Sequence, residues 1–271
     1  MSTAGEQVAP APRDAAWLWQ QIRIEAERMA RDEPILASFF HASLLGHSSL
    51  ASALAFLLAS KLGDRDVPAM LIRQTCDAVY ADNPAVVEAA AADACAHFDR
   101  DPACVDYATP LLYFKGFHAI QCYRFAHALW LAGRQGLALF LQCRIASVFD
   151  VDIHPAAQIG AGIMVDHATG VVIGETAMLG SNVSMLHGVS LGGSGVGGGR
   201  RHPRVGDEVL IAAGAKLLGP ITIGTGAKIA AGSVVLADVA AQATVAGVPA
   251  HVVGQSSVAP ALDMDQGFSG E

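Results

Sequence analysis

Aliphatic residues recur every six positions along residues 153–235. One phase contains Ile153, Ile159, Val165, Val171, Ala177, Val183 and Val189, and it resumes at Val205, Ile211, Leu217, Ile223, Ile229 and Val235. Neither the 3.6-residue period of a helix nor the two-residue alternation of a strand predicts this spacing. A hexapeptide repeat is typical of a parallel β-helix, in which three short strands make one triangular coil of about eighteen residues.

The preceding half of the chain has a helical pattern. Apolar residues recur at threes and fours, and Ala and Leu dominate over β-branched residues. We predict helices over 14–31, 34–45, 49–62, 68–80, 84–98, 110–132 and 135–147. The predicted fold class is α+β, with an all-helical oligomerisation domain (14–147) followed by a left-handed parallel β-helix (148–254). Residues 1–13 and 255–271 are predicted to be a disordered amino terminus and a flexible tail.

Composition excludes several kinds of partner. The net charge of −8 offers no basic patch for nucleic acid. No apolar run reaches the roughly 18 residues of a membrane span, and the amino terminus lacks an apolar signal core. The five cysteines form no C-x-x-C pair, which indicates reduced thiols and a cytoplasmic protein.

The repeat is interrupted between Val189 and Val205, which are sixteen residues apart instead of six. The inserted loop, residues 192–204, reads GGSGVGGGRRHPR. Loops that leave a rigid scaffold commonly carry binding groups. Because Arg200, Arg201 and His202 are bunched beside glycines, we interpret this loop as part of a site; a disordered surface excursion is the alternative.

Asp152 and His167 are polar departures from the repeat, fifteen residues apart. That spacing is three short of a coil, so the two side chains can lie near one corner on adjacent coils. A carboxylate bonded to one imidazole nitrogen would leave the other nitrogen free to take a proton from a hydroxyl.

A metal site is the competing interpretation, because some trimeric β-helices bind zinc through three histidines. Here His167, His187 and His202 are spaced by twenty and fifteen residues, with no H-x-E or C-x-x-C pattern to support them. We therefore predict no metal.

Several segments together resemble the bacterial serine O-acetyltransferase family over about residues 14–254. They are DVDIHPAAQIGAGIMVDHATGVVIGET (150–176), the loop ending RHPR, IAAGAKLLGPITIGTGAKIAAGSVV (211–235), AGVPA (246–250) and, in the helical half, DRDPACVDYATPLLYFKGFHAIQCYRFAHALW (99–130). The resemblance implies transfer of an acetyl group from acetyl-CoA, as co-substrate, to the hydroxyl of L-serine. The product would be O-acetylserine, in the first step of cysteine biosynthesis.

The resemblance also implies roles for individual residues. His167 would be the general base and Asp152 would orient it, so that the serine oxygen attacks the thioester directly; no Cys lies within the prism to form an acyl-enzyme. Asp101 and Asp166 would lie near the amino acid's ammonium group, Arg201 and His202 near its carboxylate, and Ser194 in the pocket wall. The implied cofactor-binding residues are Gly193, Ala213, Ala231 and Lys228.

The family further implies a homotrimer with sites between neighbouring prisms, a hexamer joined through helical domains, and feedback inhibition by L-cysteine. A family member usually ends in an Ile that enters O-acetylserine sulfhydrylase; this chain ends Gly267-Phe268-Ser269-Gly270-Glu271, which puts that partnership in doubt. The alternatives are a sugar O-acetyltransferase of the same fold, which usually lacks the helical domain, and a non-catalytic hexapeptide scaffold.

Overall fold

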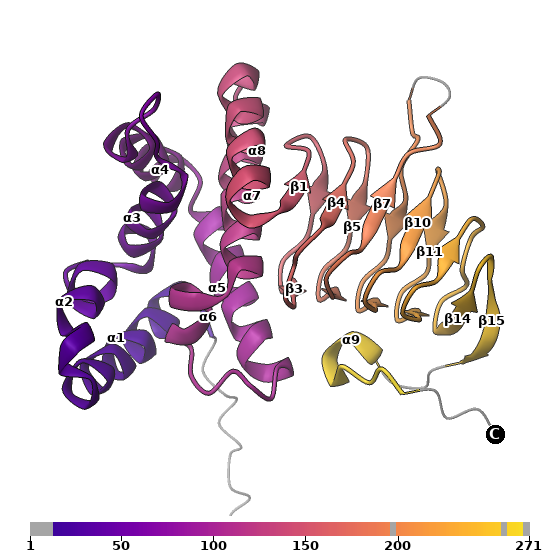
Figure 1. Ribbon diagram of the computed structural model, residues 1–271, viewed down its shortest axis with the longest axis horizontal. Coiled ribbons are helices and arrows are strands. Elements are labelled where there is room, and N and C mark those ends of the chain that lie inside the picture. The colour runs from indigo at the N-terminus through magenta and orange to yellow at the C-terminus, as the bar shows by residue number, and fades with distance from the viewer. Residues whose placement is uncertain (1–12, 196–198, 256–258, 268–271) are drawn as a thin grey trace, which may run out of the picture.

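The computed structural model describes residues 13–195, 199–255 and 259–267, and the structural statements below concern these residues. The amino-terminal half is helical, as predicted, and lies on one side of the coils (Figure 1). Its elements are α1 (Ala15–Asp32), α2 (Ala37–Phe40), α3 (Leu50–Leu62), α4 (Ala69–Asp82), α5 (Pro84–Arg100), α6 (Ala108–Tyr113), α7 (Lys115–Leu131) and α8 (Gln135–Phe149), with a 3-10 turn at Pro34–Leu36 and a π-helix at His41–Leu45. Among the described residues no single helix is long and apolar enough to cross a membrane, whereas Pro34–Leu45 and Leu50–Leu62, bent by 117° relative to each other, are so only when taken together.

Several helix ends differ from the prediction by one or two residues, and the helix predicted over 34–45 is instead a 3-10 turn, α2 and a π-helix. Two further differences lie beside the first coil. The segment predicted as one helix over 110–132 is divided at Phe114, whose extended backbone ends α6 and begins α7. The last helix of the domain continues two residues beyond 147, to Phe149, and ends at Asp150 in the left-handed conformation. Both boundaries bring helix ends against the first coil, where α7 and α8 contact β1 (Val151–Ile153).

The carboxy-terminal half is a three-sided parallel β-helix, which confirms the predicted fold class. Sheet A contains β1, β4 (Val171–Ile173), β7 (Ser190–Gly192), β10 (Lys216–Leu218) and β13 (Val234–Val235). Sheet B contains β2 (Gln158–Ile159), β5 (Met178–Leu179), β8 (Arg204–Val205) and β11 (Thr222–Ile223). Sheet C contains β3 (Met164–Val165), β6 (Ser184–Met185), β9 (Leu210–Ile211), β12 (Lys228–Ile229), β14 (Ala243–Gly247) and the antiparallel β15 (Ala250–Gln255).

The strand register shows that the coils differ in length. Partners are 18 residues apart in regular coils, as in Arg204↔Thr222, but 20 apart in the first coil, where Val151 pairs with Val171. They are 26 apart where the loop leaves the prism, as in Met178↔Arg204. The surplus that the repeat appeared to place wholly after Val189 is therefore divided, with two residues in the first coil and eight in the loop.

This division corrects the predicted phase. Ile153 pairs with Ile173 rather than with Val171, so the single phase drawn through Val165 and Val171 is wrong. Val171 is nevertheless buried, because each repeat has a second inward position that also takes aliphatic or small residues. The two inward positions of a repeat are two residues apart, so two extra residues in the first coil move the six-residue count from one buried position to the other, and the sequence pattern does not show the insertion.

A buried ion pair fastens the helical domain to the first coil. Asp93 on α5 accepts hydrogen bonds from Arg124 on α7 (2.8 and 3.0 Å) and from the backbone N–H of Ile163 (2.8 Å). Arg124 also donates to the carbonyls of Ile159 and Gly160. Since both charges are almost fully buried and multiply bonded, removing either partner would leave a costly unpaired charge.

The carboxy-terminal segment also differs from the predicted flexible tail. Within it, α9 (Pro260–Asp263) packs on sheet C against Leu186 and Leu210, and the carbonyl of Ala261 accepts a hydrogen bond from Ser184 Oγ (2.7 Å). Most of the predicted disordered amino terminus lies outside the described residues. All five cysteines are unpaired thiols, as predicted.

Candidate active site

His167 lies on a two-residue bulge at the corner between sheets C and A. Backbone hydrogen bonds place Asp166, Leu186, Ala212 and Ala230 at equivalent positions in successive coils, and likewise Thr169, His187, Ala213 and Ala231. In the later coils these two positions are adjacent in sequence, whereas His167 and Ala168 lie between them in the first. The two extra residues of the first coil are therefore His167 and Ala168.

Both bulge residues have left-handed backbone conformations, with φ of 56° and 60°. Such angles are uncommon for residues other than glycine and cost free energy unless the surroundings hold them. Short backbone bonds close the bulge, from Ala168 N–H to the Asp166 carbonyl and from Thr169 N–H to the His167 carbonyl (2.6 and 2.8 Å). The result is an imidazole that projects from the prism with 74% of its side chain exposed.

The first residues of α7 pack against this bulge. A Cβ on Gly116 would lie 2.0 Å from the carbonyl oxygen of Val165 and 3.2 Å from Cβ of Ala168, so only glycine fits there without a shift. The neighbouring Lys115 Nζ donates a hydrogen bond to Thr169 Oγ1, on the far side of the bulge. The helical domain thus contacts the turn that carries His167 from both ends.

Of the predicted acidic residues, Asp166 lies at this corner, Asp152 lies on β1 of sheet A and Asp101 lies at the end of α5. Asp166 Oδ2 is 3.6 Å from His167 Nε2, and no other carboxylate of the described residues lies within 4 Å of a nitrogen of that ring. Asp152, on β1, accepts a hydrogen bond from Gln142 Nε2 of α8 (2.7 Å), and no hydrogen bond joins it to His167 among the described residues. Asp101 ends α5 as its C-cap and accepts from the backbone N–H of Ala103 (2.8 Å).

The loop ends at a different corner, between sheets A and B. There His202 is almost fully buried against Gly174, where a Cβ would lie 1.9 Å from its Nε2. The Thr176 hydroxyl accepts from the backbone N–H groups of Arg201 and His202 (3.1 and 3.2 Å). It can therefore donate its own proton to His202 Nδ1, at 2.8 Å.

These contacts select a tautomer for His202. Its Nδ1 also accepts from the backbone N–H of Thr176 (3.2 Å), so this nitrogen carries no proton. Burial, and then the positive charge of Arg201, lower the pKa of the imidazole, which favours the neutral ring. In that state Nε2 carries the proton and is available as a donor.

Arg201 is held at the same corner by a carboxylate that the sequence reasoning missed. Its Nη2 donates to Glu175 Oε2, and this bond is the main reason that the pKa of Glu175 lies below its usual value. Arg200, one residue earlier, donates to the Ile221 carbonyl and to Thr222 Oγ1 (2.8 and 2.9 Å). Ser194, at the other end of the loop, is exposed, and its N–H donates to the Arg201 carbonyl.

The predicted cofactor-binding residues fall into three groups. Ala213 and Ala231 lie in the row that continues from Thr169 and His187 down the corner between sheets C and A, so they line up with His167. Gly193 lies beside His202 instead, at the loop corner. Lys228 is buried on sheet C beneath the carboxy-terminal segment, where its Nζ donates to Asp265 Oδ2 (3.1 Å) and to the Gly267 carbonyl.

One chain therefore does not bring all the predicted substrate residues together. His167 and Asp166 belong to one edge of the prism, whereas Arg201 and His202 belong to another. Among the described residues no group of three or more His, Cys, Asp or Glu side chains is arranged to hold a metal ion.

A prism of hexapeptide coils, with a histidine bulge and an inserted basic loop, defines the class of hexapeptide-repeat transferases. The bacterial transferase hexapeptide model (six repeats) matches residues 202–237, and the serine acetyltransferase N-terminal model matches residues 18–122. The chain is 54% identical to serine acetyltransferase of Escherichia coli (strain K12) over 254 residues, 93% of each chain. It belongs to the serine acetyltransferase family.

Solved structures agree with this assignment. Serine acetyltransferase from Vibrio cholerae superposes with a TM-score of 0.92 at 52% identity, over 94% of this chain and 99% of that one. A serine acetyltransferase in complex with cysteine gives 0.91 at 53% identity, over 93% and 98%. Similar structures also include a complex with CoA and a Neisseria gonorrhoeae enzyme in complex with serine.

Proposed function

We propose that this chain transfers the acetyl group of acetyl-CoA to the hydroxyl of L-serine, giving O-acetylserine. The proposal rests on family membership together with one structural observation, the exposed His167 on its two-residue bulge. Related solved structures hold serine, cysteine and CoA, which are the ligands that this reaction and its inhibition require.

In the proposed reaction His167 removes the proton of the serine hydroxyl as the oxygen attacks the thioester carbon. The C–S bond then breaks, and the imidazolium of His167 returns the proton to the leaving sulfur, so CoA leaves as the thiol and His167 is neutral again. The acetyl group passes directly to serine, and no acyl-enzyme forms. Asp166 is close enough to stabilise the imidazolium that arises during attack. Asp152 is retained as the orienting carboxylate, a role that requires its bond to Gln142 to be shared or exchanged.

Substrate recognition is assigned to the charged groups at the two corners. Arg201 and the Nε2–H of His202 would bind the carboxylate of serine, since a guanidinium fork suits a carboxylate. Asp101 and Asp166 would bind the ammonium group, and Ser194 would lie in the pocket wall. L-cysteine presents the same carboxylate and ammonium groups, so we propose that it inhibits by occupying this site.

These roles require two copies of the chain. Because Arg201 and His167 lie on different edges of one prism, a single serine can contact both only where two prisms meet. A cyclic trimer would place the loop corner of each prism against the bulge corner of the next. We propose such a trimer, with two trimers joined through their helical domains into a hexamer.

Acetyl-CoA would lie along the row of His187, Ala213 and Ala231, which leads away from His167 along one edge. Gly193 of a neighbouring prism would approach from the loop side. A contact between Lys228 and the nucleotide would require the bonds that Lys228 makes to Asp265 and Gly267 to be exchanged.

The proposed function is tested by measuring thiol release from acetyl-CoA with L-serine and, separately, with a panel of sugars. We expect turnover with serine alone. Turnover of a sugar without turnover of serine would instead identify a sugar O-acetyltransferase. An intact oligomer without activity on any acceptor would identify a scaffold.

A further inference from the structure

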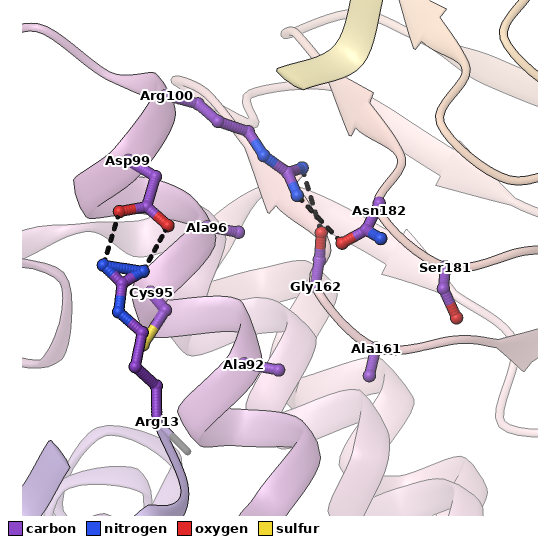
Figure 2. Close-up of a pocket in the computed structure, with 10 residues that line it drawn as sticks. All are labelled: Arg13, Ala92, Cys95, Ala96, Asp99, Arg100, Ala161, Gly162, Ser181 and Asn182. Atoms are coloured by element: carbon purple, nitrogen blue, oxygen red, sulfur yellow. Dashed lines mark hydrogen bonds and ion pairs between the residues drawn. The ribbon is translucent and has the colours of Figure 1, made fainter. Parts of the chain in front are cut away.

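A cavity of about 350 Å³ opens where α5 meets the corner between sheets B and C (Figure 2). Its walls come from α5, from Arg13 and from the turns of the first two coils. Its polar lining consists of two guanidinium groups, a carboxylate, a thiol, an amide and a hydroxyl, contributed by Arg13, Arg100, Asp99, Cys95, Asn182 and Ser181. None of these residues has a role in the proposed acetyl transfer.

Arg100 is the group that makes this cavity unusual. The residue is only 8% exposed, yet no carboxylate accepts a hydrogen bond from its guanidinium among the described residues. Nη1 donates to the Gly162 carbonyl (3.0 Å) and to Ser184 Oγ (3.1 Å), and Nη2 donates to Asn182 Oδ1 (3.0 Å). Of the five N–H donors of an arginine, Nε–H and the second Nη2–H are left without an acceptor in the described residues.

Three carboxylates, those of Asp99, Asp93 and Glu208, raise the pKa of Arg100 by their charge, and the first two are already engaged by other cations. Asp99 binds both terminal nitrogens of Arg13 (2.6 and 2.9 Å), as Figure 2 shows. Asp93 is held by Arg124. The pKa of Arg100 lies below its usual value because of burial. The nearby carboxylates raise that pKa, but they do not fully offset the loss of hydration.

We propose that this cavity binds a small oxyanion, a phosphate or sulfate group that is free or carried on a small organic molecule. Arginine forms paired N–H···O bonds with such anions, and Arg100 has two donors left for that purpose. Three neutral acceptors hold its guanidinium in place, so little side-chain entropy is lost on binding. A water occupies about 30 Å³, so the cavity has room for an oxyanion with a small substituent.

The proposal is tested by giving the Arg100 guanidinium a negatively charged partner at a residue that already accepts a hydrogen bond from it. Asn182→Asp keeps the size of the side chain and suits the left-handed backbone of this residue, where φ is 58°. It would give Arg100 a carboxylate partner in place of the amide oxygen. Asn83→Asp is the matched control, because Asn83 is exposed and lies outside the cavity.

Isothermal titration calorimetry on the full chain would measure binding of inorganic phosphate and, in a second arm, of methyl phosphate. Sodium chloride holds the ionic strength constant, and the buffer contains neither phosphate nor sulfate. We expect the unmodified chain and Asn83→Asp to bind alike. Asn182→Asp should raise the dissociation constant at least about tenfold while leaving the melting temperature unchanged or higher.

The two arms identify the source of the anion. Tighter binding of methyl phosphate would indicate a phosphate carried on an organic molecule, and equal or weaker binding would indicate the free ion. The proposal is overturned if neither probe binds to the unmodified chain. It is also overturned if Asn182→Asp and Asn83→Asp bind the probe equally, since Arg100 would then act only in holding α5 on the coils.

Discussion

At the scale of single residues, His167 is the side chain on which the proposed chemistry depends most. Replacing it with alanine should lower turnover by about 10²–10⁴-fold, the range expected for loss of a general base. Thermal stability should be unchanged, because 74% of the side chain is exposed and its removal leaves no cavity. Asp152→Asn should cost less, since it orients the ring rather than taking the proton.

Steady-state thiol release from acetyl-CoA, together with a melting curve, measures both effects. The matched control is His251→Ala, which removes another exposed imidazole from β15 and should retain activity. Near-normal turnover in His167→Ala would refute the assignment of His167 as base.

His97 on α5 is a second informative residue, for stability rather than catalysis. It packs against Phe114 and Phe117, and neither ring nitrogen has a hydrogen-bond partner within the described part of the chain. Burial lowers its pKa from 6.5 to about 3. The unfolded chain therefore binds a proton below pH 6.5 that the folded chain excludes down to about pH 3, so His97 makes stability fall as the pH falls through that window.

His97→Leu should therefore raise the free energy of unfolding, and should raise it more in acid. The additional gain at pH 5 over pH 7 should be about 2 kcal/mol, from 1.36 kcal/mol for each unit between 6.5 and 5. Urea denaturation of both proteins at the two pH values provides the measurement. His118, whose pKa burial lowers to about 4, remains in both proteins and cancels in the difference. A gain that is the same at both pH values would show that His97 does not titrate as described.

At the scale of elements, the contact between α7 and the bulge predicts a loss of activity from a change in the helical domain. Gly116→Ala would place a methyl group 2.0 Å from the Val165 carbonyl, so either α7 or the bulge must move. We expect a destabilisation of about 1–3 kcal/mol and a fall in kcat of at least about tenfold, because small displacements of a catalytic group are costly.

Gly136→Ala on α8 is the matched control, since a Cβ there has nothing within 4 Å. That change should leave kcat unaltered and stabilise the chain by about 0.4–1 kcal/mol. Calorimetric melting and steady-state kinetics below the transition temperature separate the two effects. If Gly116→Ala lost stability but kept its full kcat, α7 would be a packing element only.

The elements also show how far the sequence can be interpreted without a structure. Hexad spacing predicted the prism because every strand must repeat the same inward position. The spacing could not locate the bulge, because Val171 is also buried, at the other inward position of its repeat. The six-residue spacing therefore continues past the two extra residues without a visible break. The structural mark of the bulge is the left-handed backbone of His167 and Ala168. A sequence suggests that conformation only where it has glycine or asparagine, and neither stands at these positions.

Other features depend on contacts between distant segments. The break at Phe114 arises where two helices meet the first coil, and α9 forms against Leu186 and Leu210 although its own sequence is weakly helical. In the sequence Arg100 stands between Asp99 and Asp101. Its neutral partners Gly162, Ser184 and Asn182 come from another domain, so no local pattern could have indicated the cavity.

At the scale of the whole molecule, the placement of His167 and Arg201 on different edges predicts that active sites are shared between chains. Two variants, His167→Ala and Arg201→Ala, should each be impaired alone. When they are co-expressed and mixed at random in a trimer, about a quarter of the interfaces should combine an intact His167 with an intact Arg201 from the next chain. Activity at low serine concentration should recover to about that fraction of the unmodified level.

The control mixes the unmodified chain with the double variant His167→Ala/Arg201→Ala in equal amounts. Shared sites predict about a quarter of full activity for this mixture as well, whereas sites within one chain predict about half. Sites within one chain would give no activity in the mixture of single variants. Compared with shared sites, they therefore predict less activity in that mixture and more in the control. No recovery there, with half activity in the control, would place the whole site in one chain and remove the reason for a trimer.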